Sequence, residues 1–311
     1  MNEARALAAI DIGSNSILLE TATVVDGHIR PQLHRKETVR LGGALDADNL
    51  LQPEAMQRGW ECLSRYAQLI AHIPPAQRRV AATQTLREAA NRDVFLQEAA
   101  RILQCPVEVI SGELEAALIY QGVCLFLPER NDERLVVDIG GRSTELCWGR
   151  GMQLQHAHSC PVGSVAWAQR FFPEGDLSEA AFARAHEAAL QLLAPTAAAR
   201  AHLARHPHTH VYGASGTAGA ISKILSAHGH APGSITREAL WGLRDQLQQW
   251  GHTSRIKLQG LRPELLPVIG GGISLMCAVF AALDLHHMRM AQGALRHGLL
   301  ASMLHSPDRA A

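Results

Sequence analysis

Two segments of the sequence place an acidic residue directly between an apolar run and a glycine turn. In "AIDIGSNSILLE" the acid is Asp11, and in "VVDIGGRSTELC" it is Asp138. The two segments align at a constant offset of 127 residues (138 minus 11), which also superimposes Gly13 on Gly140. A strand, an acid and a glycine turn that recur in this way indicate two halves built on one plan.

The chemistry that such turns favour is phosphate binding. Backbone amides in a glycine turn can converge on an anion because no side chain blocks the approach. A carboxylate beside bound phosphates is repelled unless a cation lies between them, and Mg²⁺ is held in such sites by one or two carboxylates and water. We therefore expect phosphates at both turns, with Mg²⁺ or another divalent cation near Asp11 and Asp138.

The elements that must position these turns are strands and helices in alternation. Two further segments, "VYGASGTAGAISKIL" and "PVIGGGISLMCAVFAAL", are each predicted to form a strand, a glycine turn and a helix. Segment 178–206 is rich in Ala and Leu and has the 3.6-residue period of a helix. This alternation predicts an α/β fold, in which ligands lie at the carboxyl ends of the strands.

The predicted organisation is two domains, residues 1–126 and 127–311, with the last helix able to pack back on the first domain. The polar segment "LPERNDER", residues 127–134, separates the two halves and is the predicted hinge.

Composition excludes several classes of protein. The 29 basic and 29 acidic residues balance, which argues against a broadly basic nucleic-acid-binding protein. The six cysteines are scattered without a CxxC pair, which is typical of reduced, buried thiols in a cytosolic protein. Neither the N-terminus nor the apolar stretch "ISLMCAVFAALDL" has the length of a signal peptide core or a membrane span. We expect a cytoplasmic protein without a nucleic-acid or membrane partner.

Further motifs make the chain resemble a known family. "AIDIGSNSILL", "ATQTLREA", "ISGELEAALIYQGV", "VVDIGGRSTEL", "YGASGTAGAI" and "GALRHGLL" occur in the order seen in the Ppx/GppA phosphatases. These enzymes are exopolyphosphatases and guanosine pentaphosphate phosphatases of the actin/sugar-kinase/heat-shock ATPase superfamily. The resemblance extends over nearly all of residues 8–301 and is to the short, two-domain form. It implies two ribonuclease-H-like (actin-like ATPase) domains with an interdomain cleft, and a homodimer.

The resemblance also assigns roles to individual residues. Glu115 matches the catalytic base; from spacing alone, either Glu113 or Glu115 could face the ligand. Arg87 matches a phosphate-binding arginine, and Asp138 and Glu145 match acids associated with Mg²⁺, although spacing alone would also allow Glu145 to be a solvated strand residue. The remaining assignments are to three phosphate or nucleotide turns: Ser14 and Asn15; Gly140, Gly141 and Ser143; and Gly213, Ser215 and Gly216.

The chain departs from the family pattern at two positions. Arg142 replaces the third glycine of "DIGGGSTE", and His297 replaces the glutamate of "LREG". Because arginine adopts φ > 0 only at a cost, we predict an ordinary φ at Arg142. Its guanidinium is expected to bind phosphate oxygens, with solvent as the alternative.

The predicted function is hydrolysis of the terminal phosphoanhydride of inorganic polyphosphate, with release of orthophosphate. The first alternative is 5′-phosphate hydrolysis of guanosine pentaphosphate, although no motif for base recognition is present. A sugar-kinase-like phosphotransferase and a non-catalytic alarmone sensor are further alternatives. The histidines of "HLARHPHTH" are interpreted as belonging to a loop rather than to a zinc site.

Overall fold

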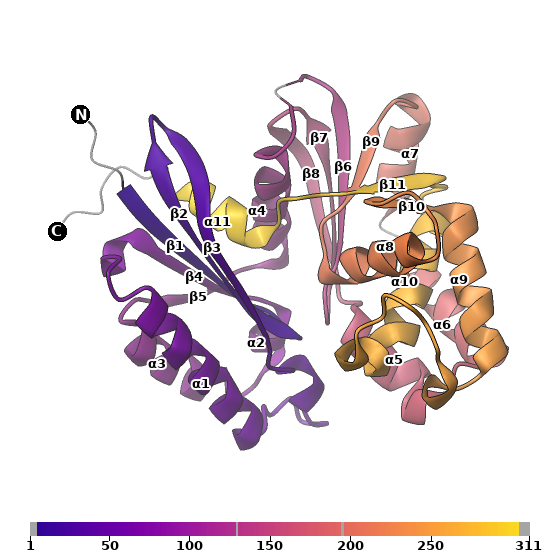
Figure 1. Cartoon of the computed structure of the whole chain (residues 1–311), viewed down its shortest axis with the longest axis horizontal. Helices are drawn as coiled ribbons and strands as arrows, with labels where there is room; N and C mark the ends of the chain where they lie inside the picture. The colour runs from indigo at the N-terminus through magenta and orange to yellow at the C-terminus, as the bar shows by residue number, and fades with distance from the viewer. Residues whose placement is uncertain (1–4, 129, 194–195, 305–311) are drawn as a thin grey trace. The chain divides into compact units, whose positions relative to one another are not determined.

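The computed structural model describes residues 5–128, 130–193 and 196–304, which form two compact units (Figure 1). Unit 1 comprises Met1–Leu125 and Gly293–Ala311, and unit 2 comprises Phe126–Gln292. The chain therefore leaves unit 1 one residue before the predicted boundary. It returns to unit 1 for its last helix.

Unit 1 is built on a five-stranded mixed sheet of order β3-β2-β1-β4-β5. Its strands are β1 (Arg5–Ile12), β2 (Ser16–Val25), β3 (His28–Thr38), β4 (Arg78–Ala82) and β5 (Val107–Val109). Helices α1 and α3 cover one face, and α4 and α11 cover the other (Figure 1). The helices are α1 (Pro53–Leu69), α2 (Gln84–Glu88), α3 (Arg92–Leu103), α4 (Gly112–Cys124) and α11 (Leu295–Ser302).

Unit 2 contains a six-stranded sheet of order β10-β11-β9-β6-β7-β8. Its strands are β6 (Glu133–Ile139), β7 (Thr144–Arg150), β8 (Gln153–Cys160), β9 (His210–Gly213), β10 (Ser234–Thr236) and β11 (His287–Met290). Its helices are α5 (Ser164–Phe171), α6 (Glu179–Leu192), α7 (Ala197–Arg205), α8 (Gly216–Ala227), α9 (Arg237–Trp250) and α10 (Ile269–Ala282).

The two sheets repeat one topology. Read from β8, the order β8-β7-β6-β9-β11 corresponds to β3-β2-β1-β4-β5, with β10 added at the edge. The first hairpin ends with the pair Ile12–Ile17 and the second with Ile139–Thr144, again 127 residues apart. The predicted α/β class, with two units built on one plan, is confirmed.

Each unit has its own hydrophobic core, formed where the sheet meets its helices. All six cysteines are buried, as predicted, and none forms a disulfide bond. The segment Pro263–Ala282 is long and apolar enough to cross a membrane by composition, but 67% of its most apolar window is buried inside the fold. We interpret it as a core segment of unit 2.

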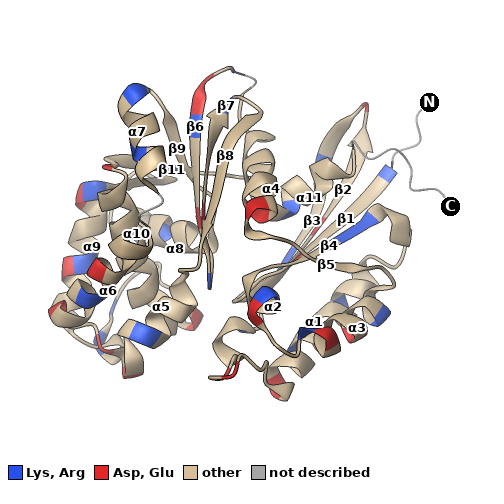
Figure 2. Cartoon of the chain, turned by 180° about the vertical axis from the view of Figure 1, so that it is seen from behind, with Lys and Arg blue, Asp and Glu red and all other residues tan. Residues whose placement is uncertain are grey.

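Figure 2 shows how the balanced charge is distributed. Lys or Arg and Asp or Glu occur together on α1, α3, α6 and α9, so none of these four helices presents a uniformly basic surface.

One predicted glycine turn is wrong. "PVIGGG" does not follow a strand; it runs from a 3₁₀ segment, Pro263–Val268, into the first turns of α10. A Cβ on Gly270 would contact the Phe172 ring, and one on Gly271 would overlap backbone atoms of α5. These glycines therefore allow α10 to pack closely against α5.

The predicted hinge, 127–134, includes residue 129, which lies outside the described residues. Within the described part, the buried Arg134 donates to Asp132 Oδ1 at 2.8 Å and to the carbonyl of Pro128 at 2.8 Å. These bonds tie the segment to unit 2. Any pivot would thus lie closer to the points where the chain passes between the units, at 125–126 and 292–293.

Candidate active site

The two predicted phosphate turns have the same backbone geometry. The Gly13 amide donates to the Ser16 carbonyl at 3.1 Å, and the Gly140 amide donates to the Ser143 carbonyl at 2.9 Å. Neither glycine has a positive φ. A Cβ would lie only 3.0 Å from the carbonyl oxygen in the first turn and 3.2 Å in the second. Glycine is therefore favoured at both positions by the tightness of the turn.

In both turns the fold uses backbone carbonyls as acceptors, whereas it leaves some of the backbone amides without an acceptor. The Asn15 carbonyl accepts from Val39 at 3.0 Å, and the Gly141 carbonyl accepts from Val165 at the start of α5 at 2.8 Å. Among the described residues, the amides of Ser14, Asn15 and Gly141 donate to no acceptor. Adjacent amides with this polarity form a concave site suited to an anion.

Asp138 and Glu145 form a pair of carboxylates on unit 2. They are direct cross-strand partners on β6 and β7, so their side chains project from the same face of the sheet. Glu145 is only 1% exposed and accepts a hydrogen bond from Ser159 Oγ at 2.8 Å, so it is not a solvated strand residue. Two carboxylates placed in this way fit a divalent cation, which would offset their repulsion.

The described residues contain no group of three or more His, Cys, Asp and Glu side chains able to hold a metal by themselves. A cation at Asp138 and Glu145 would therefore need water or phosphate oxygens as further ligands, as is usual for Mg²⁺. Asp11 lies half-buried near the end of β1 in unit 1.

Glu115 lies in the first turn of α4. Ser111 caps this helix by accepting from the Leu114 amide at 3.2 Å. Glu113 is exposed, whereas Glu115 is only 7% exposed and forms an ion pair with Arg87 at 2.8 Å. Burial raises the pKa of Glu115 above its ordinary value, and the charge of Arg87 partly offsets that rise. A buried carboxyl with a raised pKa is suited to general-base chemistry near neutral pH.

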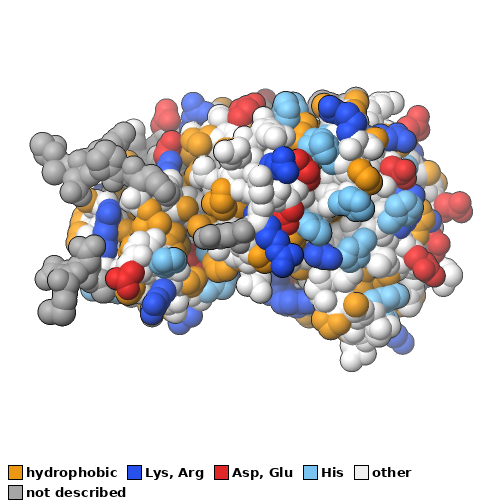
Figure 3. Space-filling model, turned by 90° about the horizontal axis from the view of Figure 1, so that it is seen from above, with side chains coloured by type: hydrophobic (Ala, Val, Ile, Leu, Met, Phe, Trp, Pro, Cys, Tyr) orange, Lys and Arg blue, Asp and Glu red, His pale blue; other side chains and the backbone are white. Residues whose placement is uncertain are grey.

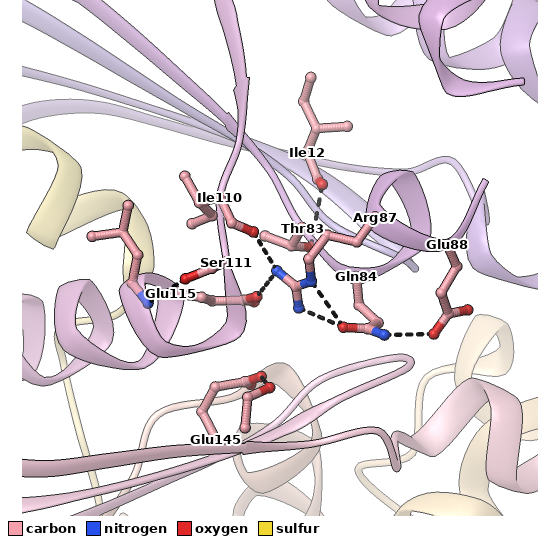
Figure 4. Close-up of polar contacts among 11 residues, drawn as sticks. Ile12, Thr83, Gln84, Arg87, Glu88, Ile110, Ser111, Glu115 and Glu145 are labelled. Atoms are coloured by element: carbon pink, nitrogen blue, oxygen red, sulfur yellow. Dashed lines mark hydrogen bonds and ion pairs between the residues drawn. The ribbon is translucent and has the colours of Figure 1, made fainter. Parts of the chain in front are cut away.

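Arg87 is held on three sides (Figure 4). Its Nη1 donates to Glu115 Oε2 and to the Ile110 carbonyl at 2.8 and 2.7 Å. Its Nε and Nη2 both donate to Gln84 Oε1, at 2.9 and 2.6 Å. Gln84 and Ile110 are not among the site residues predicted from the sequence, although Gln84 lies three residues before Arg87 on one helix, a spacing that places the two side chains close together.

The third turn joins β9 to α8 and has the predicted strand–turn–helix form. Ser215 caps α8 by accepting from the Ala218 amide at 2.9 Å, and Gly216 is the first helical residue. A Cβ on Gly213 would lie 2.8 Å from Met288 Sδ, which gives this glycine a packing role.

Arg142 lies half-buried in the second turn, and its φ is not positive, as predicted. A Cβ on Gly163 would overlap the backbone of Gly141 and Arg142. The residue before α5 is thus packed directly against this turn.

The start of α11 is packed against α4. A Cβ on Gly122 would overlap the Ala294 carbonyl, and one on Gly298 would overlap the Leu118 carbonyl. His297 Nδ1 accepts from the Ala294 amide at 3.1 Å, which caps α11. The two glycines of "GALRHGLL", Gly293 and Gly298, therefore bring α11 against the helix that carries Glu115.

Within the described part of the chain, the histidines near β9 contact aromatic rings and each other. His202 and His206 stack on α7 with ring centroids 4.5 Å apart, and His202 also lies 6.2 Å from the Trp148 ring. His210 begins β9. Figure 3 shows several histidines dispersed over one face of the molecule.

The predicted site residues are divided between the units. Unit 1 contains Asp11, Ser14, Asn15, Arg87 and Glu115, and unit 2 contains the others. The structure brings Arg87 to Glu115 and places Asp138 beside Glu145.

Comparisons with known proteins agree with this architecture. The structure of the PPX-GPPA enzyme of Aquifex aeolicus is 25% identical, with 96% of this chain and 99% of that chain covered and a TM-score of 0.78. An exopolyphosphatase-like protein is also 25% identical, with 97% and 98% covered and a TM-score of 0.81. An exopolyphosphatase from Cytophaga hutchinsonii, at 22% identity, shares the fold with a TM-score of 0.84 over 96% of this chain and 98% of that one.

The model of one protein family, described as the Ppx/GppA phosphatase family, matches residues 21–307. Since this match covers most of the sequence, the chain belongs to the Ppx/GppA phosphatase family.

Proposed function

We propose that this family phosphatase is an exopolyphosphatase, which hydrolyses the terminal phosphoanhydride of inorganic polyphosphate and releases orthophosphate. The observation that carries the proposal is the buried Glu115, paired with Arg87 at the start of α4. The backbone amides of the two repeated turns support it, since a chain of phosphates offers many acceptors. A relative that is 25% identical is itself described as exopolyphosphatase-like.

In the proposed reaction, Glu115 orients the attacking water and accepts its proton. The amides of Ser14, Asn15 and Gly141 bind phosphate oxygens, and Arg87 adds positive charge. Asp138 and Glu145 would hold Mg²⁺, which would neutralise phosphate charge when bound. Positioning and charge neutralisation supply most of the rate in phosphoryl transfer, so these residues need to do little covalent chemistry.

Glu115→Gln tests the base. A general base contributes about 10²–10⁴-fold, so we expect kcat for phosphate release to fall by about that factor while the thermal unfolding temperature changes little. Glu113→Gln is the matched control, because Glu113 lies on the same turn of α4 but is exposed. Near wild-type turnover of Glu115→Gln, or an equal loss in both variants, would remove Glu115 from the mechanism.

Guanosine pentaphosphate is the competing substrate, because its 5′ end presents the same terminal phosphoanhydride. Phosphate release from the two substrates, measured at equal Mg²⁺, separates them. A higher kcat/KM for polyphosphate is expected. A higher value for guanosine pentaphosphate would replace the proposed substrate, and ATP-dependent phosphorylation of a small acceptor would indicate a phosphotransferase instead. Tight alarmone binding without turnover of either substrate would indicate a sensor.

We also propose that the protein acts in the cytoplasm as a homodimer. Its six buried cysteines, none of which forms a disulfide bond, support a reducing compartment. Light scattering at micromolar concentration tests the dimer, and a purely monomeric protein would refute it.

A further inference from the structure

We propose that Gln84 is a positioning residue that holds the Arg87 guanidinium against Glu115. This inference rests on the proposed function, since it concerns the base of that reaction. Gln84 is the first residue of α2, the short helix that also carries Arg87.

The contacts form a chain of alternating donors and acceptors (Figure 4). Gln84 Nε2 donates to Glu88 Oε1 at 2.6 Å. Gln84 Oε1 accepts from both Nε and Nη2 of Arg87, at 2.9 and 2.6 Å. Arg87 Nη1 then donates to Glu115 Oε2 at 2.8 Å. A residue three positions from the arginine thus connects to the base through the guanidinium.

This arrangement fixes the guanidinium by two of its edges. The Nε–Nη2 edge is held by the single oxygen of Gln84, and Nη1 is held by Ile110 and Glu115. Arginine is a long side chain with several rotatable bonds, so anchoring both edges removes most of its freedom. Without Gln84, only the Nη1 contacts would direct it.

Glu88 determines which end of the Gln84 amide faces Arg87. Its carboxylate accepts from the amide nitrogen, which turns the amide oxygen toward the guanidinium. The reversed amide would set N–H donors against N–H donors on one side and oxygen against carboxylate on the other. The hydrogen bond to Glu88 therefore orients the Gln84 amide so that its oxygen accepts from Arg87.

Arg87 is the charged group of unit 1 whose field reaches Glu115. Helix α11 packs along α4 and carries Arg296 and His297, but both turn to Glu20, at 2.9 and 3.8 Å. Glu113, on α4 itself, is exposed. Burial raises the pKa of Glu115, and the nearby Arg87 charge lowers it. If Arg87 moved away, the main interaction that lowers this pKa would be lost.

The test is Gln84→Met, which keeps the length of the side chain and removes the acceptor. We expect kcat to fall by about tenfold, because two hydrogen bonds to a charged group are lost. The acid limb of kcat/KM should also move to higher pH, because Glu115 is less often ionised. In an Arg87→Met background, Gln84→Met should cause no further shift, since Gln84 acts through Arg87.

A rescue variant distinguishes positioning from simple stabilisation of α2. Gln84→Glu combined with Glu88→Gln exchanges the two groups and keeps the order of donors and acceptors. It should restore most of kcat at pH values above the acid limb. Failure of this rescue, with the fold intact by thermal unfolding, would contradict the proposal.

A titration that needs no turnover separates this inference from the proposed function. In protein labelled with ¹³C at the glutamate carboxyl, the Glu115 signal is the one absent from Glu115→Gln. Its pKa should be higher in Gln84→Met than in wild type, even if neither polyphosphate nor guanosine pentaphosphate is hydrolysed. Equal titration of Glu115 in the two proteins would overturn the role of Gln84 while leaving the proposed function in place.

Discussion

Acidification to about pH 5 should lower the free energy of unfolding by about 2 kcal/mol less in His297→Gln than in the wild-type protein. His297 is 4% exposed, and its Nδ1 accepts from the Ala294 amide. Burial, with the charges of Arg296 and His34, lowers its pKa from 6.5 to about 3. Protonation of Nδ1 would also break the cap of α11. Glutamine can accept the same amide hydrogen bond but does not titrate.

The magnitude follows from the two pKa values. The unfolded chain binds a proton on His297 below pH 6.5, while the folded chain resists it until about pH 3. The neutral, buried His297 therefore makes its full contribution to the free energy of unfolding above pH 6.5, and this contribution is lost progressively as the pH falls below 6.5. Each pH unit below 6.5 lowers the free energy of unfolding by about 1.4 kcal/mol, so at about pH 5 the wild-type protein has lost about 2 kcal/mol of it.

Urea unfolding at about pH 7.5 and about pH 5 measures this difference. The other buried histidines are present in wild type and in the variant, so their effects cancel in the comparison. His72→Gln, at an exposed histidine, is the matched control and should retain the wild-type loss on acidification. An equal loss in wild type and His297→Gln would refute the assignment of a buried, neutral His297.

Three further predictions concern packing, metal and substrate. Gly298→Ala should lower the free energy of unfolding by about 2–3 kcal/mol, because its methyl group overlaps the Leu118 carbonyl; thermal unfolding near the wild-type temperature would contradict this. Asp138→Asn should raise the Mg²⁺ concentration for half-maximal phosphate release by about tenfold or more, and an unchanged Mg²⁺ titration would exclude Asp138 as a ligand. Arg142→Gly should raise KM for polyphosphate, more strongly at low salt, and an unchanged KM at low salt would assign Arg142 to the solvent.

The sequence predicted those parts of the site that depend on local signals. The repeated hairpin was visible because an acid, a glycine and alternating apolar residues occupy the same positions around Asp11 and Asp138. Ser111 likewise marks the start of α4, because its side chain caps the helix two to three residues on. Each of these motifs spans about ten residues or fewer, so it could be recognised without knowledge of contacts between distant segments.

The parts that were missed depend on contacts between distant segments. Three glycines in "PVIGGG" look like a turn, yet they are helical, and the absence of a side chain at Gly270 and Gly271 allows the close packing of α5. Glu113 and Glu115 could not be separated by spacing, since the contact that distinguishes them is with Arg87, 28 residues away. Pairing across this distance depends on the tertiary fold, which brings Arg87 of α2 within 2.8 Å of Glu115 of α4, and periodicity does not encode that contact.

The histidine at position 297 illustrates how such a contact changes the meaning of a motif. A glutamate there, as in "LREG", would suit the third position of a helix, where it accepts from the capping amide. In this chain Glu20 already supplies a buried carboxylate, which pairs with Arg296 at 2.9 Å and lies 3.8 Å from His297 Nε2. A second carboxylate at 297 would lie close to Glu20, and the two like charges would repel each other. A neutral histidine preserves the cap and the Glu20–Arg296 pair together, and so keeps α11 packed against the helix that carries Glu115.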